Sequence, residues 1–357
     1  MNLTDVIEDL VEERGLEKDK VISAVCDGVL AAYSRKYPDT DFSVVFDNKT
    51  GEAQVFVKKK VVSRVAEEDS EISLKKSHST VPGAKVDDVI DVLFGGGIGR
   101  VEVLVAKQVI ANKIRTIEQA AVFAEFEDKE GTIVTGNVHK KERAGYVVQL
   151  GEAMALLPSA NCISGENIRI GGPVRALLVQ VLSEPKGDYQ LILDRASAEF
   201  VKKLIELEIP EVFEGIVEIK KIVRSSGYKT KVAVVSASKD IDPVGTCIGV
   251  DGVRIKPILR ELGGEKIDVI GWSESLESFV KNSLKPAEID KVETVDDKRA
   301  MVWLAKDQRS RAIGKMGRNI LLASKLTGIE INLQEVTSGH GVEAPELESL
   351  EEEEEKE

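Results

Sequence analysis

The pattern of apolar and polar positions predicts a mixed α/β segment at the start of the chain. Apolar residues recur at helical spacing over 19–37, which predicts an amphipathic helix. Over 41–64 they alternate with polar residues on both sides of the turn sequence DNKTG, a pattern typical of a β-hairpin. A charged segment rich in turn residues follows at 67–82, and 99–125 predicts a helix longer than the globular average. We therefore expect an α/β N-terminal domain that ends in a long connector helix.

From residue 131 the pattern changes to short apolar segments separated by glycine. They lie at 132–138, 145–150, 153–157, 174–181 and 190–193. Five strands over this length of chain suit one small β-barrel. The sequence AGYVVQLG at 144–151, followed by ALLP at 155–158, resembles the S-one type of OB barrel. The resemblance implies that one face of the barrel and its loops bind single-stranded RNA, and the scarcity of aromatic residues on that face leads us to expect weak binding.

Barrels of this type bind RNA by stacking bases on aromatic side chains and by a track of cations. Tyr146 is the candidate stacking residue, and the candidate phosphate contacts are His139, Lys140, Lys141, Arg143 and Arg195. Aromatic residues make up only 4% of the chain, and the richer aromatic set of the family is missing from this face. A core or rim position for Tyr146 is therefore an equal alternative.

The sequence Gly-x-x-Gly occurs twice in similar surroundings. The first copy is GVDG, from Gly249 to Gly252, and the second is GKMG, from Gly314 to Gly317. Each follows a short apolar segment and precedes a helical one and an alternating strand, and the loops are offset by 65 residues. Helix, Gly-x-x-Gly, helix and strand in this order resemble a KH domain. The helix and strands expected before the first loop suit the prokaryotic type (type II), so we expect two such domains in tandem.

The paired glycines suit a loop that holds an RNA backbone. Without Cβ atoms, a sugar-phosphate chain can approach closely, and N–H groups at the start of the next helix face the phosphates. Besides the four glycines, we expect contacts from the polar side chains Arg254, Lys256, Lys315, Arg318 and Asn319. Asp251 lies in the first loop, where a carboxylate would repel phosphate. The second KH domain should therefore contribute more RNA affinity than the first.

The distribution of charge is compatible with RNA binding although the total is acidic. The 357 residues have a formal net charge of −13, and this length suits about two to four domains. Residues 1–130 carry 18 basic and 25 acidic side chains, 131–343 carry 30 and 29, and 344–357 carry 1 and 8. The middle of the chain is therefore nearly neutral, with basic clusters at 220–231 and 309–318. The composition of the tail 344–357 predicts a disordered segment. Its role is either solubility alone or, as a sharper hypothesis, competition with RNA for the basic surface.

Several other classes of protein find little support in the composition. The three cysteines and three histidines are scattered, so we expect no disulfide framework, no metal site and no cofactor. The N-terminus lacks the basic start and apolar run of a signal peptide, and no apolar segment is long enough to span a bilayer. We expect no membrane association and a cytoplasmic protein. The glycines at 95–97 lack the spacing of a nucleotide-binding loop.

A barrel of the S-one type followed by two KH domains, behind an acidic N-terminal domain, resembles the NusA family of bacterial transcription factors. Matching sequences are GR at 99–100, AKQVI at 106–110, DPVG at 242–245, LGGEKID at 262–268 and AIGK at 312–315. The resemblance implies a factor, not an enzyme, that binds RNA polymerase near its RNA exit channel and takes the nascent single-stranded RNA. It also implies effects on pausing, termination and antitermination. Arg100 and Lys107 on the connector helix are then the candidate polymerase contacts, with a solvated helix face as the alternative.

The same resemblance implies how the chain is divided. The expected parts are a polymerase-binding domain at 1–128, the barrel at 129–199, KH domains at 200–278 and 279–343, and the tail at 344–357. Other antitermination factors of the Nus type are further expected partners. We expect the protein to be a monomer.

Two alternative functions are open at this point. Some exoribonucleases combine KH and S-one-type domains, but residues 1–130 lack a cluster of carboxylates and histidines with metal-ligand spacing. In this chain the barrel also precedes the KH domains. An RNA-binding module that serves the ribosome or RNA turnover is the closer alternative, because the sequence does not reveal the partner of the N-terminal domain.

Overall fold

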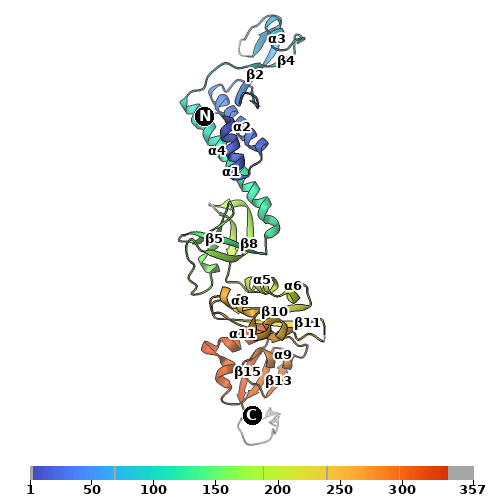
Figure 1. Ribbon diagram of the computed structural model, residues 1–357. Helices are drawn as coiled ribbons and strands as arrows, with labels where there is room; N and C mark the ends of the chain where they lie inside the picture. Colours follow the sequence, from blue (N-terminus) through green and yellow to red (C-terminus); the bar gives the residue numbers. More distant parts are fainter. Residues whose placement is uncertain (1–2, 68–69, 188, 239, 297, 337–357) are drawn as a thin grey trace, which may run out of the picture. The chain divides into compact units, whose positions relative to one another are not determined.

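The N-terminal part of the computed structural model combines helices with a four-stranded sheet (Figure 1). The structure describes residues 3–67, 70–187, 189–238, 240–296 and 298–336, so the expected acidic tail lies outside the described residues. The helices are α1 (Leu3–Arg14), α2 (Lys18–Lys36), α3 (Leu74–Thr80) and α4 (Arg100–Phe126). The strands are β1 (Phe42–Asp47), β2 (Glu52–Val62), β3 (Glu71–Ser73) and β4 (Val89–Leu93).

The helices and the hairpin predicted from the pattern are present. Helix α2 buries one apolar face, and β1 pairs with β2 in an antiparallel register that places Phe42 opposite Val57. Helix α4 confirms the long helix expected before the barrel. The segment 67–82 contains more structure than its charged composition predicts, because β3 pairs in parallel with β2 and α3 follows it directly.

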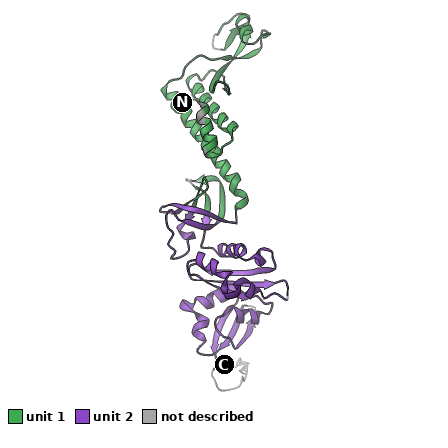
Figure 2. Cartoon of the chain, viewed as in Figure 1, with its two compact units in different colours: residues 1–131, 147–156, 178–192 green, residues 132–146, 157–177, 193–357 purple. Residues whose placement is uncertain are grey.

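The chain divides into two compact units, and the division runs through the strands of the barrel (Figure 2). Unit 1 comprises residues 1–131, 147–156 and 178–192. Unit 2 comprises residues 132–146, 157–177 and 193–357, and therefore contains the loops of greatest functional interest.

The barrel is closed by five strands, as the spacing of the apolar segments predicts. In the order in which they pair around the barrel, they are β5 (Ile133–Lys141), β6 (Gly145–Leu150), β7 (Ala153–Pro158), β9 (Tyr189–Asp194) and β8 (Pro173–Lys186). Short 3₁₀ turns, η1 (Glu127–Lys129) and η2 (Ser159–Asn161), precede β5 and follow β7. Only glycine fits at position 145, at the start of β6, because the Cβ of any other residue would lie 2.1 Å from the carbonyl oxygen of Leu157.

Two KH domains with the same topology follow the barrel. The first contains α5 (Ala198–Glu208), α6 (Pro210–Phe213), β10 (Val217–Ser225), β11 (Lys229–Ser236), α7 (Pro243–Ile248), η3 (Val250–Gly252), α8 (Ile255–Glu261) and β12 (Lys266–Gly271). The second contains α9 (Leu276–Ser283), β13 (Lys291–Asp296), β14 (Arg299–Leu304), α10 (Arg309–Ile313), η4 (Lys315–Gly317), α11 (Arg318–Thr327) and β15 (Glu330–Glu335). In each sheet the first two strands are antiparallel and the third is parallel to the second. The divisions expected after residues 199 and 278 fall inside α5 and α9.

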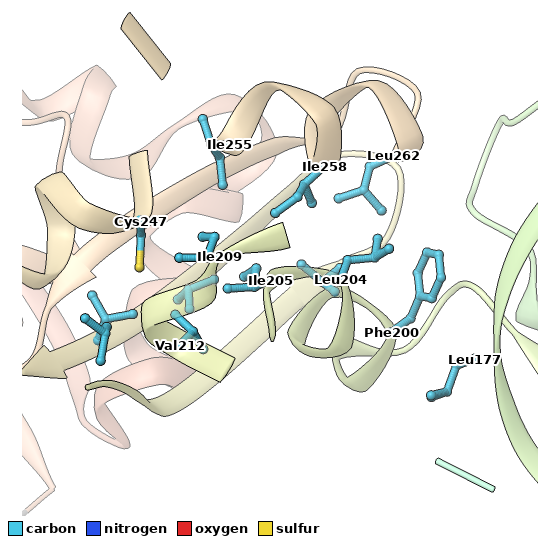
Figure 3. Packing of buried hydrophobic residues seen from close by; sticks show 14 of the residues in the cluster. Leu177, Phe200, Leu204, Ile205, Ile209, Val212, Cys247, Ile255, Ile258 and Leu262 are labelled. Atoms are coloured by element: carbon cyan, nitrogen blue, oxygen red, sulfur yellow. The ribbon is translucent and has the colours of Figure 1, made fainter. Parts of the chain in front are cut away.

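A continuous apolar core joins the first KH domain to part of the barrel within unit 2. Figure 3 shows Phe200 and Leu204 of α5 near Ile258 of α8 and near Leu262, which directly follows α8, with Leu177 of β8 at the edge of the cluster. Each of these side chains is at most 4% exposed. Complete burial of such a side chain stabilises a fold by about 1.5–3 kcal/mol. This core fixes α8, the helix that follows the first Gly-x-x-Gly loop.

Candidate nucleic-acid interface

The two Gly-x-x-Gly loops have the same backbone conformation. Gly249 has φ 74° and ψ 167°, and Gly314 has φ 72° and ψ 174°. This combination belongs to a region that is essentially restricted to glycine. Two residues later, Asp251 (φ 51°, ψ 23°) and Met316 (φ 56°, ψ 28°) are both left-handed. The sequence offset of 65 residues therefore marks a structural repeat, and side chains at equivalent positions can be compared directly.

A side chain five residues after the first glycine supports each loop. In the first domain, Arg254 Nη1 donates a hydrogen bond to the carbonyl oxygen of Thr246 at 2.9 Å. In the second, Asn319 Nδ2 donates to the carbonyl oxygen of Arg311 at 3.3 Å. Both carbonyls lie three residues before the glycine. The loops are thus tied to the ends of the helices that precede them.

This support changes the role expected for two candidate residues. Asn319 is only 4% exposed, and its amide is occupied by main-chain carbonyl groups, so it is not placed to contact RNA. The guanidinium of Arg254 is paired with the carboxylate of Glu211 at 2.8 Å. Each residue lies five positions after the first glycine of its loop. The side chain of Asn319 is buried, whereas that of Arg254 is half-buried and paired within its own domain.

The surroundings of the two loops differ in charge. Residues 240–256 contain three acidic and two basic side chains, whereas the equivalent residues 305–321 contain one acidic and five basic side chains. A groove of about 580 Å³ beside the first loop is lined in part by Glu211, Asp240 and Asp242, and by Arg254, which pairs with Glu211 and leaves the two aspartates in excess. At loops of equal backbone geometry, this difference favours phosphate at the second loop.

The remaining candidates at the loops are accessible. Asp251 and Lys256 are exposed at the first loop, and Lys315 is exposed in the second. Arg318 is half-buried, and its guanidinium carbon lies 4.4 Å from the centroid of the Tyr228 ring. Tyr228 lies in the turn between β10 and β11, 90 residues before Arg318, and no sequence signal marked it as a candidate.

The barrel candidates gather around the turn between β5 and β6, with one exception. His139, Lys140 and Arg143 are exposed there, and Lys140 Nζ is paired with Glu142 at 2.8 Å. Tyr146 is half-buried, and Lys141 Nζ lies 5.2 Å from its ring centroid. These residues form a small cationic surface with a single aromatic ring.

The exception is Arg195, which the structure places in the interior. It is 5% exposed, and its guanidinium donates to Glu166 Oε2 at 2.9 Å and to Glu261 Oε1 at 2.6 Å. Burial alone would lower the pKa of Arg195, but hydrogen bonds and charge from the two carboxylates outweigh burial and raise it. Arg195 therefore links the barrel to the first KH domain and is not among the surface cations.

The two candidates on the connector helix lie on the surface. Arg100 and Lys107 are both exposed on α4, and a separation of seven residues places them close to one face of a helix. Leu104 lies between them on the same face and is 66% exposed. Two cations around an exposed leucine form a surface suited to a protein or RNA partner.

The described residues lack several features that mark other kinds of site. That part of the chain contains no cluster of His, Cys, Asp and Glu that could hold a metal ion. None of the helices described is long and apolar enough to cross a membrane. The thiols of Cys162 and Cys247 are protonated at neutral pH, because burial raises the pKa of each to about 11.

Three models of protein domains match the chain. The NusA N-terminal domain matches residues 2–120, the NusA-like first KH domain matches 195–272, and the NusA-like second KH domain matches 276–340. The two KH matches cover the two loops whose geometry repeats.

Curated proteins named transcription termination/antitermination protein NusA align over nearly the whole chain. The protein from Halalkalibacterium halodurans is 34% identical over 352 residues, which cover 98% of this chain and 91% of the relative. The protein from Bacillus subtilis is 33% identical over 351 residues, which cover 97% and 94%. The solved N-terminal domain of NusA from B. subtilis is 29% identical over 33% of this chain and 96% of that chain, with a TM-score of 0.27. The chain therefore belongs to the NusA family of transcription termination/antitermination proteins.

Proposed function

We propose that this protein binds nascent single-stranded RNA beside a transcribing RNA polymerase and modulates pausing, termination and antitermination. Its relatives bear the name of termination and antitermination proteins, which supports a role in transcription. It acts by binding and not by catalysis. The observation that carries the RNA-binding part is the pair of Gly-x-x-Gly loops with matching backbone angles.

The second KH domain supplies the larger share of the affinity for RNA. Gly314 and Gly317 allow the sugar-phosphate backbone to approach, while Lys315 and Arg318 supply positive charge. The first domain holds RNA more weakly through Gly249, Gly252 and Lys256, because Asp251 and the acidic groove oppose phosphate. The barrel adds a weak contact through Tyr146, His139, Lys140 and Arg143.

The connector helix α4 supplies the contact with RNA polymerase. Arg100, Leu104 and Lys107 share one exposed face, which suits an acidic partner surface that has an apolar centre. The protein works in the cytoplasm, where bacterial polymerase transcribes, as a monomer that also meets other antitermination factors of the Nus type. We propose that the first KH domain begins before α5 and the second before α9. The boundary between the N-terminal domain and the barrel lies near residue 128, and the boundary between the second KH domain and the tail lies near residue 343.

Transcription by purified bacterial RNA polymerase tests this proposal. Added full-length protein should lengthen pauses and change the fraction of transcripts that end at a hairpin terminator. The double variant Arg100→Glu/Lys107→Glu should lose both effects but keep its affinity for free RNA. The matched control Lys75→Glu/Lys76→Glu reverses two exposed charges of the same N-terminal domain and should behave as the unchanged protein.

The alternative of ribosomal or RNA-turnover binding gives a different result. If the full-length protein co-sediments with purified ribosomes but leaves the pausing and termination pattern of the polymerase unchanged, the role in transcription is wrong. RNA binding by the KH domains would survive that outcome, because it depends on the loops and not on the N-terminal partner.

A further inference from the structure

The two KH domains meet beside the second Gly-x-x-Gly loop. Arg318 is the first residue of α11 and follows Gly317 directly. Its guanidinium carbon lies 4.4 Å from the centroid of Tyr228, a residue of the first KH domain. Both side chains are half-buried, so each also meets solvent. A planar cation therefore lies over an aromatic ring, next to the loop expected to hold phosphate.

A network of charged and polar groups holds this contact in place. Lys229 Nζ, next in sequence to Tyr228, donates to Asp268 Oδ2 at 2.8 Å and to Asn319 Oδ1 at 3.4 Å. The fully buried Lys231 donates to the same Asp268 oxygen at 2.8 Å and to the carbonyl oxygen of Lys285 at 3.1 Å. Asp268 belongs to the first KH domain, whereas Asn319 and Lys285 belong to the second. The end of the β10–β11 hairpin is thus tied to the start of α11.

Apolar packing reinforces the same junction. Ala233 and Ile270 of the first KH sheet form a buried cluster with Phe279 of α9 and Leu326 of α11, and each is at most 6% exposed. The β10–β11 hairpin and the N-terminus of α11 are therefore held in place, so Tyr228 and Arg318 lose little conformational entropy when a ligand binds. Such preorganisation favours binding.

We propose that Tyr228 and Arg318 form a stacking site for a nucleobase, built jointly by the two KH domains. The inference rests on the proposed RNA binding by the second loop and identifies the part of the nucleotide that is bound beside it. RNA-binding proteins commonly stack unpaired bases on aromatic rings and on guanidinium planes. A nucleotide whose phosphate lies on the glycine loop would place its base against the partly exposed Arg318, whose guanidinium carbon lies over the ring of Tyr228.

The first Gly-x-x-Gly loop has no such site at the equivalent position. Val253 stands 65 residues before Arg318 and is 65% exposed, without a planar cation. Among the residues that the structure describes, the stacking site therefore belongs to the second loop. The first KH domain thereby contributes to RNA binding despite the unfavourable charge of Asp251, because its β10–β11 hairpin completes the stacking site of the second KH domain.

Binding of abasic RNA separates stacking from simple support of the loop. The full-length protein and its Tyr228→Leu variant are titrated with a short single-stranded RNA and with copies in which one base at a time is removed. Tyr228→Leu should weaken binding of the intact RNA about tenfold. For the unchanged protein, one abasic position should cause a similar loss, and for Tyr228→Leu the same position should cause almost none.

Several controls make the result decisive. Tyr228→Phe keeps the ring and should keep the preference for the intact base, while Arg318→Lys keeps the charge but removes the plane and should lose that preference. Trp303→Leu removes another ring that lies near a cation, that of Lys291 at 5.6 Å, and should leave RNA binding as it was. If Tyr228→Leu weakens intact and abasic RNA equally, or weakens neither, the stacking site is wrong. If the unchanged protein binds no RNA at all, the proposed function itself fails.

Discussion

The Gly-x-x-Gly loop of the second KH domain predicts unequal effects of alanine at its two glycines. Gly314 has φ 72° and ψ 174°, a conformation essentially restricted to glycine, and a Cβ there would lie 2.7 Å from the Cβ of Asn319. Gly317 has φ 71° and ψ 8°, an ordinary left-handed conformation, and a Cβ there would meet no atom within 4 Å. We expect Gly314→Ala to lower the free energy of unfolding by about 3 kcal/mol, from strain and overpacking together. Gly317→Ala should lower it by about 1 kcal/mol.

Urea unfolding measured by tryptophan fluorescence can resolve this difference. The chain contains two tryptophans, Trp272 and Trp303, and Trp303 lies in strand β14 of the second KH domain. In a Trp272→Phe background, the fluorescence signal therefore reports the unfolding of that domain. Equal losses for the two alanine variants, or a larger loss for Gly317→Ala, would refute the assignment of the tight packing to Gly314.

A buried charge, the acidic tail and the partly buried thiol of Cys162 give three further expectations. Arg195→Met leaves the carboxylates of Glu166 and Glu261 without their partner, so the free energy of unfolding in urea should fall by about 3 kcal/mol. The affinity for RNA should change less than about twofold. Lost RNA affinity at unchanged stability would contradict the interior role of Arg195. Deletion of residues 344–357 should tighten RNA binding at low salt and have little effect at high salt, and an unchanged affinity at low salt would exclude competition by the tail. Burial raises the pKa of Cys162 to about 11. Its alkylation by iodoacetamide at pH 8 should therefore be about 100-fold slower than that of an unperturbed cysteine, and should accelerate as the pH approaches that pKa. Equal alkylation rates for Cys162 and an unperturbed cysteine would contradict the burial.

Much of the fold was predictable because it depends on local periodicity. The hairpin of β1 and β2, the long helix α4 and the five barrel strands all follow from the spacing of apolar residues. The loops were predictable for a different reason, since a glycine pair in equivalent surroundings occurs twice. The short elements β3 and α3 were missed, because a three-residue strand and a charged seven-residue helix carry too little periodic signal.

The roles of individual side chains were harder to predict than the positions of the loops. Arg195 looked like a surface cation, yet its two carboxylate partners lie 29 and 66 residues away in the sequence. Asn319 looked like a ligand for RNA because it follows the second loop, but its amide supports that loop from within. Tyr228 gave no signal at all. Burial and long-range pairing decide such roles, and both arise only when the chain is folded.

We propose that the second Gly-x-x-Gly loop holds RNA more strongly than the first because of charge. The test is the affinity of a short single-stranded RNA for the full-length protein, measured by fluorescence anisotropy for Lys315→Asp and Asp251→Lys. An exposed charge about 4 Å from a phosphate contributes about 1 kcal/mol or more, so Lys315→Asp should weaken binding about tenfold and Asp251→Lys should strengthen it several-fold. The slope of log affinity against log salt should fall by about 0.7 for Lys315→Asp. Unchanged binding by Lys315→Asp, together with weaker binding by Asp251→Lys, would contradict a charge-based preference of RNA for the second loop.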